Sequence, residues 1–190
     1  MDSSRQTGTA GIDSRFTALF RNHYDEVLGY CVRRTTHADA QDCASEVFVV
    51  AWRRIDELQW DTARPWLYGI ARGVLANRRR SADRQIRLSR KVSGLAQGTA
   101  EDPNVIVVRA EQDAEVMDAL SKLKDSDREI LILSTWEELT SPEIAVALNI
   151  STSAAEQRLH RAKQRFARHL KDIPQDAQFT PRAVKEGGGR

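Results

Sequence analysis

Long apolar runs are missing from this sequence of 190 residues. No stretch approaches the roughly 20 consecutive apolar residues that a membrane-spanning helix needs. The first residues, MDSSRQTGTAG, also have no apolar core like that of a signal peptide. We therefore expect a cytoplasmic protein with no membrane insertion.

Cysteine is scarce as well, because the chain has only two, too few for a disulfide framework. Cys31 and Cys43 both fall in helical patterns, so we expect buried free thiols. His37 lies midway between them, and a zinc site built from these three residues and a distant ligand is an alternative, as is a redox switch. The spacing matches no compact metal motif, so the sequence predicts no metal site and no cofactor.

The usual signatures of catalysis are also absent from the sequence. There is no glycine-rich phosphate loop, no His-Glu-x-x-His motif and no nucleophile with a suitable base. Clustered carboxylates occur only on helix faces that should be solvated. We therefore expect a binding protein and not an enzyme.

The net charge is small, at +2, but the charges are unevenly distributed. Nine basic residues and one acid lie between residues 64 and 91. Residues 101–143 contain twelve acids and four bases, and residues 144–171 contain six bases and one acid. A signal for nucleic-acid binding must therefore come from local clusters. The acidic stretch from Glu111 to Glu129 is expected to be a solvated face away from nucleic acid, with contact to another protein as the alternative.

What the sequence does contain is a helix-turn-helix pattern, SPEIAVALNISTSAAEQRLHRAKQ. Ser141 is a suitable N-cap and Pro142 suits the first helical position of a short helix. Asn149 should end that helix, because asparagine tolerates the left-handed conformation of a tight turn. Ser151 or Thr152 can cap the helix that follows.

In this second helix, apolar residues recur at steps of three or four and form one stripe, while polar and basic residues cover the opposite face. The stripe consists of Ala155, Leu159, Ala162, Phe166 and Leu170. Such a helix can lie against DNA. An ordinary helical hairpin with a solvated cationic face is the alternative.

Helical periodicity covers most of the remaining chain, and no strand pattern of any length is visible. The sequence therefore predicts an all-α protein with two small helical domains joined by a flexible linker. Ser126 and Glu129 form a capping-box pattern in the second domain. The expected segments are a disordered arm at 1–12, a first domain at 13–91, a linker at 92–108, a second domain at 109–171 and a disordered tail at 172–190.

Three blocks of sequence resemble the extracytoplasmic-function group of bacterial sigma factors. They are DAQDCASEVFVVAWRR at 39–54, RPWLYGIARGVLANRRR at 64–80 and SKLKDSDREILILSTWEELTSPEIAVALNISTSAAEQRLHRAKQR at 121–165. Each block alone is weakly specific, whereas the three in this order are highly specific. The resemblance covers about residues 14–170. It implies a promoter-specificity subunit that binds core RNA polymerase and recognises minus-35 and minus-10 promoter elements in transcription initiation.

The resemblance implies that the first block docks on the clamp helices of the largest polymerase subunit. A plain amphipathic helix is the simpler interpretation, and both can hold for different faces. We expect Phe48 and Trp52 to pack in the core. The expected polymerase-binding residues are charged: Asp39, Asp42, Glu46 and Arg53. By the same resemblance, the flap of the second-largest subunit and an anti-sigma factor are further partners.

The resemblance also implies that the loop around Trp60 captures an unpaired base of the non-template strand at the minus-10 element. Stacking and phosphate contact would recover the cost of extruding the base, so that binding drives promoter opening. Local packing of Trp60 is an equal alternative, whereas Trp66 is expected in the core. The basic residues of the helix after Pro65 should meet phosphates. The expected minus-10 residues are Trp60, Arg64, Arg72, Asn77, Arg78, Arg79, Arg80 and Arg84.

The second helix of the helix-turn-helix is implied to recognise the minus-35 element of promoter DNA. The expected residues are Thr152, Ser153, Ala154, Glu156, Gln157, Arg158, His160 and Arg161. Glu156 occupies a position that is commonly basic in the family, and it could accept from a cytosine amino group but cannot bind phosphate. We therefore expect an atypical minus-35 preference. Two further departures, Gly73 for the usual Asn and Asn77 for a frequent Asp, concern the minus-10 contacts.

A stand-alone helix-turn-helix transcriptional regulator is the alternative function. Such a protein would bind duplex DNA by itself. It would leave the first 90 residues and the base-capture loop unexplained, so the sequence favours the sigma factor.

Overall fold

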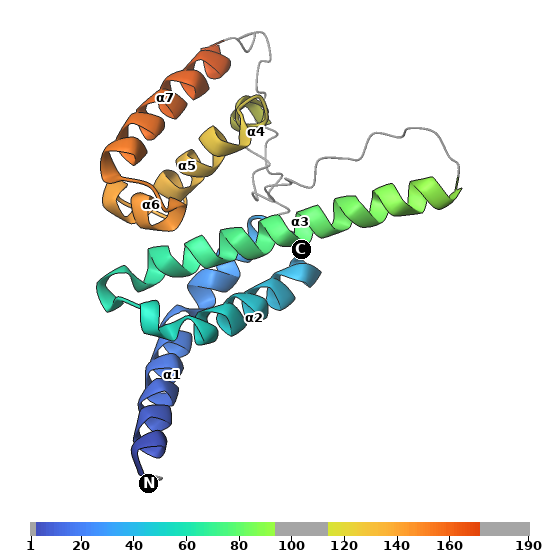
Figure 1. The fold of residues 1–190 in the computed structure, drawn as a ribbon. Helices are drawn as coiled ribbons and strands as arrows, with labels where there is room; N and C mark the ends of the chain where they lie inside the picture. The colour runs from blue at the N-terminus through green and yellow to red at the C-terminus, as the bar shows by residue number, and fades with distance from the viewer. Residues whose placement is uncertain (1–2, 94–113, 172–190) are drawn as a thin grey trace, which may run out of the picture.

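The structure, a computed structural model, describes the backbone of residues 3–93 and 114–171 (Figure 1). Within these ranges it contains helices and turns and no strand, which confirms the predicted all-α class. None of the described helices is long and apolar enough to cross a membrane. The expected tail and most of the expected linker lie outside the described residues. The elements are α1 (Ser3–Val32), α2 (His37–Arg53), the short 3-10 helices η1 (Ile55–Glu57) and η2 (Trp60–Thr62), α3 (Ala63–Ser93), α4 (Ala114–Ser121), α5 (Asp125–Thr135), α6 (Ser141–Leu148) and α7 (Thr152–Lys171).

Helices α1, α2 and α3 form the N-terminal domain, because each carries an apolar stripe at helical spacing. Leu19 of α1, Val47 of α2 and Leu67 of α3 are fully buried in its core. Phe48 is also buried, as predicted, and its ring centroid lies 4.8 Å from that of Phe20. The three stripes thus pack on one another, and they fix the positions of the outward-facing residues.

Trp52 differs from the prediction, because its side chain is 39 % exposed and not in the core. It lies in the last turn of α2, where the ring of Phe16 packs edge-on against it with the centroids 4.8 Å apart. An indole is too large to be enclosed by one such neighbour, and tryptophan is seldom fully buried. Trp66, by contrast, is partly buried and packs against the core as expected.

Two helices are longer than the sequence predicted. α1 begins at Ser3, so the segment expected as a disordered arm at 1–12 is largely helical. α3 continues to Ser93, past the expected domain end at residue 91. Once the apolar stripe of a segment has nucleated a helix, each residue added at the end gains one backbone hydrogen bond. Extending the helix into a polar segment therefore costs little free energy. The polar composition of these ends therefore does not mark the helix boundaries.

The first cap of the helix-turn-helix also differs from the prediction. Thr140, and not Ser141, is the N-cap of α6. The amide and hydroxyl of Thr140 both donate to the Glu143 carboxylate, at 2.8 and 2.7 Å. The N-cap lies one residue earlier than expected because a capping box with Glu143 needs a hydroxyl residue three positions before it, which is Thr140 and not Ser141.

Loss of this carboxylate should destabilise α6. Glu143→Gln is expected to lower the free energy of unfolding by about 1 kcal/mol, because an amide oxygen accepts more weakly than a carboxylate and the favourable negative charge at the helix N-terminus is lost. The hydrogen bonds from Thr140 hold the pKa of Glu143 below its ordinary value. This stabilisation is therefore present above the ordinary pKa and is lost as the pH falls through the lowered one. Urea unfolding at neutral and acidic pH measures the effect, and an equal loss in the control Glu138→Gln, at an exposed neighbouring carboxylate, would contradict it.

The turn between α6 and α7 forms as predicted. Asn149 adopts the left-handed conformation, with φ of 52° and ψ of 54°. The Ser151 hydroxyl then accepts a hydrogen bond from the Ala154 amide at 3.2 Å and caps α7. These local contacts fix the angle between α6 and α7.

The two domains are packed against each other, and α3 lies between α1 and α2 on one side and α5 and α6 on the other (Figure 1). A Cβ atom added at Gly69 of α3 would lie 3.0 Å from the carbonyl oxygen of Ala147 in α6. Glycine permits this approach because it has no side chain. Buried apolar residues of both domains belong to one cluster. The described residues therefore show a closed arrangement, in which the C-terminal domain (α4 to α7) covers one face of α3.

Candidate functional site

Helix α7 presents its polar face to solvent, as the sequence predicted. Ala155 and Ala162 of its apolar stripe are fully buried. Of the eight residues expected to contact the minus-35 element, six are exposed, while Ala154 and Arg158 are half-buried. Exposed polar side chains near the N-terminal end of such a helix are what a major groove can accept. The polar face of α7 that is expected to contact DNA is therefore accessible in the closed arrangement.

Trp60 lies in the short segment between α2 and α3, and its side chain is 45 % exposed. The buried residues Leu58 and Ala63 anchor the segment on both sides. The Thr62 amide donates to the Gln59 carbonyl at 3.0 Å and closes a tight turn around the tryptophan. Of the two roles considered from the sequence, stacking on a base requires such an exposed ring, whereas local packing does not.

Three of the expected minus-10 arginines share the face of α3 that is turned toward the C-terminal domain. Arg64, Arg72 and Arg79 follow one another at spacings of eight and seven residues, which place them on one side of a helix. Arg64 lies 3.9 Å from Glu143 of α6, and Arg79 lies 3.9 Å from Asp125 of α5. This face therefore meets carboxylates of the other domain.

The other expected minus-10 arginines are exposed or pair within the N-terminal domain. Arg80 and Arg84 are exposed, and Arg80 donates to the side-chain oxygen of Asn77 at 2.5 Å. Arg78 donates to the Glu46 carboxylate of α2 at 2.9 Å. The structure thus joins an expected DNA-binding residue to an expected polymerase-binding residue, so these two surfaces adjoin.

The expected polymerase-binding residues lie along one outer face of α2. Asp39, Asp42 and Arg53 are exposed, and Glu46 is half-buried beside Arg78. Val49 also lies on this face and is 49 % exposed, although it is not among the predicted residues. Its position could have been found, because the five residues follow one another at steps of three and four. We name these five residues the α2 outer stripe.

The two cysteines are buried neighbours, as expected of free thiols. Their sulfur atoms lie 3.4 Å apart, with Cys31 donating to Cys43. This hydrogen bond raises the pKa of Cys31, which burial raises further, and it lowers the pKa of Cys43. His37 is exposed at the start of α2. The described residues contain no group of three or more potential metal ligands, so the zinc alternative finds no support there.

The acidic stretch from Glu111 to Glu129 is solvated only in part, because Asp118 and Asp125 are exposed whereas Asp127 is buried and Glu129 is half-buried. Glu137, in the loop after α5, has a side chain that is only 1 % exposed. Its carboxylate accepts hydrogen bonds from Arg33 at 2.5 Å and from Arg34 at 2.8 Å, both in the turn that follows α1. Charge composition shows that acids and bases are present, but it does not show which faces of two domains meet. The acids here neutralise arginines of the N-terminal domain.

Glu129 joins the same contact and does not form the predicted capping box with Ser126. α5 begins at Asp125 with Lys124 as its N-cap, so Ser126 lies inside the helix. Glu129 instead accepts from the Tyr30 hydroxyl at 2.9 Å and lies 3.5 Å from Arg34. The Arg34 guanidinium also stacks on the Tyr30 ring at 3.5 Å, and burial raises the pKa of Tyr30. We name the four charged residues the interdomain ion-pair cluster: Arg33, Arg34, Glu129 and Glu137.

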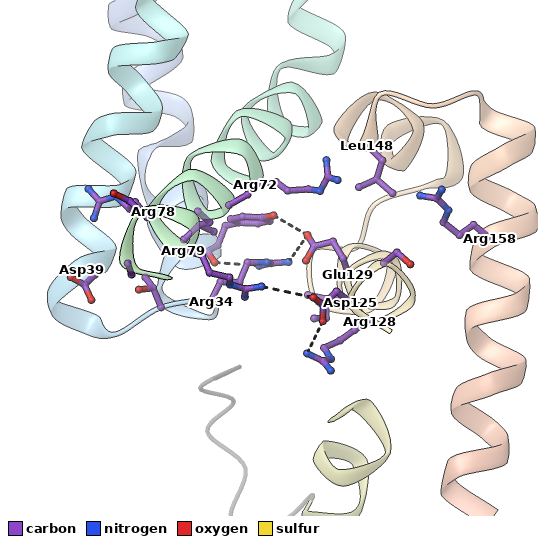
Figure 2. Close-up of a pocket in the computed structure, with 18 of the residues that line it drawn as sticks. Arg34, Asp39, Arg72, Arg78, Arg79, Asp125, Arg128, Glu129, Leu148 and Arg158 are labelled. Atoms are coloured by element: carbon purple, nitrogen blue, oxygen red, sulfur yellow. Dashed lines mark hydrogen bonds and ion pairs between the residues drawn. The ribbon is translucent and has the colours of Figure 1, made fainter. Parts of the chain in front are cut away.

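A groove of about 740 Å³ lies between the domains beside this cluster (Figure 2). Six arginines and three carboxylates line it, so its charge is net basic. Figure 2 shows Arg72 of α3 and Arg158 of α7 extending toward each other from the two domains, near Leu148. The closed arrangement thus brings an expected minus-10 residue and an expected minus-35 residue into one groove.

Two family models match the chain. The model described as Sigma-70 region 2 matches residues 19–85, and the model described as Sigma-70, region 4 matches residues 113–166. The first match falls within α1 to α3 and the second covers α4 to most of α7. Each family region therefore corresponds to one of the two helical domains.

The chain is also similar to known sigma factors over most of its length. It is 34 % identical over 155 residues to RNA polymerase sigma factor YlaC of Bacillus subtilis (strain 168), across 80 % of this chain and 90 % of the relative. It is 31 % identical over 180 residues to ECF RNA polymerase sigma factor SigL of Mycobacterium tuberculosis (strain ATCC 35801 / TMC 107 / Erdman), across 90 % and 97 % of the two chains. Its fold is similar to that of the sigma factor RpoE, solved with the anti-sigma factor NepR from Bartonella quintana. That likeness has a TM-score of 0.59 at 19 % identity, over 83 % of this chain and 98 % of the other.

Proposed function

Because this chain belongs to the extracytoplasmic-function group of the sigma-70 family, and is thus a DNA-binding promoter-specificity subunit of RNA polymerase, we propose how its domains divide that work. α7 reads the minus-35 element in the major groove, and the N-terminal domain binds and opens the minus-10 element. One observation carries this division. The chain exposes a reading helix in one domain and, in the other, Trp60 next to a basic helix. Duplex recognition alone would need only the first.

Promoter opening is proposed to proceed by capture of an unpaired base on Trp60. Extruding a base costs a few kcal/mol, and stacking on an aromatic side chain recovers about 1–3 kcal/mol per base. Arg80 and Arg84 are exposed on α3 and supply phosphate contacts, which add affinity without sequence information. Binding thereby drives melting without ATP.

The α2 outer stripe is proposed to dock on the clamp helices of the largest polymerase subunit, in the cytoplasm. Asp39, Asp42 and Glu46 give this stripe a negative end, and Arg53 a positive one, so charge can orient the encounter. Val49 lies between them and offers the apolar centre that a protein interface needs. The C-terminal domain is proposed to meet the flap of the second-largest subunit.

Val49→Asp should weaken binding to core polymerase roughly tenfold, because it places a charge at the centre of an interface where a single buried side chain can contribute more than 1 kcal/mol. Fluorescence anisotropy of labelled protein with core polymerase, without DNA, measures this. Leu88→Asp is the matched control, since Leu88 is an apolar residue of α3 that is 63 % exposed. If both variants bind as the wild type does, Val49 is not part of the docking surface.

Run-off transcription with purified core polymerase tests the whole proposal. A pool of genomic fragments is transcribed with and without the protein, and the transcript starts are sequenced. We expect starts that share minus-35 and minus-10 elements and occur only when the protein is added. Tight binding to duplex DNA, with no added starts and no polymerase binding, would instead support the stand-alone regulator.

An anti-sigma factor is proposed to hold the protein inactive. Solved structures of similar fold support this, because they are complexes with a second protein, which in the first case is an anti-sigma factor. RpoE is bound to NepR, and CnrH, which is 25 % identical to this chain with a TM-score of 0.52, is bound to the cytosolic domain of CnrY. Reversal of transcription by a co-expressed regulator, with recovery of a one-to-one complex, would test this partner.

A further inference from the structure

We propose that the groove between the domains binds a nucleoside polyphosphate, a ligand that the promoter-binding role does not require. Arg72, Arg158 and Arg34 hold the phosphates, and the base lies against apolar side chains of the wall. The groove has a volume of about 740 Å³, which is within the roughly 300–1,000 Å³ of sites for small molecules and cofactors. A space of this size holds one small molecule.

Two arginines of the groove face each other without an anion between them. Arg72 of α3 and Arg158 of α7 extend toward each other from the two domains (Figure 2). The side chain of neither forms an ion pair or a hydrogen bond with another residue that the structure describes. Converging like charges repel each other, and the walls of a groove strengthen this repulsion because they exclude water. A phosphate placed between the two guanidinium groups replaces the repulsion with two charge-assisted hydrogen bonds.

Arg34 adds a third guanidinium with an unsatisfied donor. It lines the same groove, and its side chain is only 9 % exposed. Its Nε atom is buried and has no hydrogen-bond partner in the described part of the chain. A buried N–H group without an acceptor is destabilising, so most such groups in folded proteins have a partner. The planar fork of donors on a guanidinium matches phosphate oxygens, and a phosphate ligand therefore supplies the acceptor that the protein does not.

Two of the three carboxylates that line the groove are engaged by residues other than the two facing arginines. Asp125 lies 3.5 Å from Arg128 and 3.9 Å from Arg79. Glu129 accepts a hydrogen bond from the Tyr30 hydroxyl at 2.9 Å. With six arginines against three carboxylates, the groove keeps an excess of positive charge. This excess favours an anion that carries several charges, as a polyphosphate does.

Part of the wall is apolar, which distinguishes the groove from a site for inorganic phosphate. Leu75 of α3, Ile132 of α5 and Leu148 of α6 all line it. Figure 2 shows Leu148 close to the facing Arg72 and Arg158. The faces of a nucleobase are largely apolar, and removing them from water against such side chains stabilises the complex. The phosphate contacts and the apolar contacts thus lie within reach of one bound nucleotide.

Isothermal titration calorimetry of the chain with ATP and with GTP tests the site. Titrations with tripolyphosphate and with adenosine, at the same ionic strength, separate the contribution of the phosphates from that of the base. We expect one nucleotide per chain, bound roughly tenfold or more tightly than tripolyphosphate, and no measurable binding of adenosine alone. Equal affinities for ATP, GTP and tripolyphosphate would overturn the assignment of a nucleotide. No saturable binding of either nucleotide would overturn the site.

Substitutions in both domains locate the ligand. Arg72→Ala and Arg158→Ala should each weaken nucleotide binding roughly tenfold to hundredfold, because each removes a hydrogen bond between charged groups. The matched controls are Arg87→Ala on α3 and Arg168→Ala on α7, which remove the same charge from exposed positions that do not line the groove. Equal weakening in all four variants would show only general attraction of an anion to a basic surface and would overturn the proposal. Loss in just one of the two groove variants would also overturn it, because the ligand is held from both domains.

The test of this site is independent of the test of the proposed function, because the titration contains neither polymerase nor DNA. A chain that supports run-off transcription but binds neither nucleotide retains the proposed function and lacks the site. A chain that binds a nucleotide through Arg72 and Arg158 but supports no transcription has the site and lacks the proposed function.

Discussion

Trp60→Ala should slow open-complex formation roughly 5- to 150-fold while leaving polymerase binding unchanged. The range corresponds to the 1–3 kcal/mol that stacking of one base on an aromatic side chain contributes. The substitution should cost little stability, because the Trp60 side chain is 45 % exposed and the buried residues Leu58 and Ala63 anchor the segment independently. Permanganate reactivity of unpaired thymines around the minus-10 element measures the opening directly.

Trp52→Ala is the matched control for this experiment. Trp52 is 39 % exposed in α2 and packs on Phe16, so its removal should lower thermal stability and leave promoter opening unchanged. Trp60→Phe should retain a large part of the opening rate, because a phenyl ring still stacks. If Trp60→Ala and Trp52→Ala slow promoter opening equally, the loss of any large side chain from the N-terminal domain explains the defect, and stacking of a base on Trp60 does not.

The parts of the fold that follow local rules could be predicted from the sequence. Asn149 in the left-handed conformation and Ser151 as a cap depend on contacts within a few residues, and the structure shows both. The apolar stripes of α1, α2 and α3 likewise follow from spacing alone. The predicted N-cap of α6 was wrong by one residue. Thr140 and Ser141 both carry a hydroxyl that suits the position, and only their separation from Glu143 in the sequence decides between them.

The closed arrangement could not be predicted, because it joins residues that are far apart in the chain. Arg33 and Glu137 are 104 positions apart, and neither carries a local signal for the other. The sequence showed an excess of acid in one segment and of base in another, which is compatible with solvated faces as well as with pairing. Gly69 shows the same limit, because a glycine inside a helical pattern gives no sign in the sequence that the backbone of α6 lies against it. The sequence therefore predicts each DNA-binding residue separately. The structure adds that the C-terminal domain covers the face of α3 that carries Arg64, Arg72 and Arg79.

Glu156→Gln should change which promoters the protein selects more than how tightly it binds them. Glu156 is exposed on the reading face of α7, where a carboxylate can accept from a cytosine amino group. A good contact of this kind contributes about 1–3 kcal/mol of discrimination, so preference at one base pair of the minus-35 element should fall roughly 5- to 150-fold. The salt dependence of binding should stay the same, because a carboxylate releases no counterion from phosphate.

Glu156→Arg separates base reading from charge. It removes the same acceptor but adds a cation, so discrimination should fall while the slope of the logarithm of affinity against the logarithm of salt concentration steepens by about 0.9. Selection from a library randomised in the minus-35 element, performed with polymerase at two salt concentrations, measures both quantities, with Glu138→Gln as an exposed carboxylate outside α7. If Glu156→Gln weakens binding to all library members equally, the carboxylate affects only the overall electrostatic potential of the domain and does not read a base. A change in preference confined to one base pair of the minus-35 element would instead show that Glu156 causes an atypical promoter preference. The family commonly has a basic residue at this site.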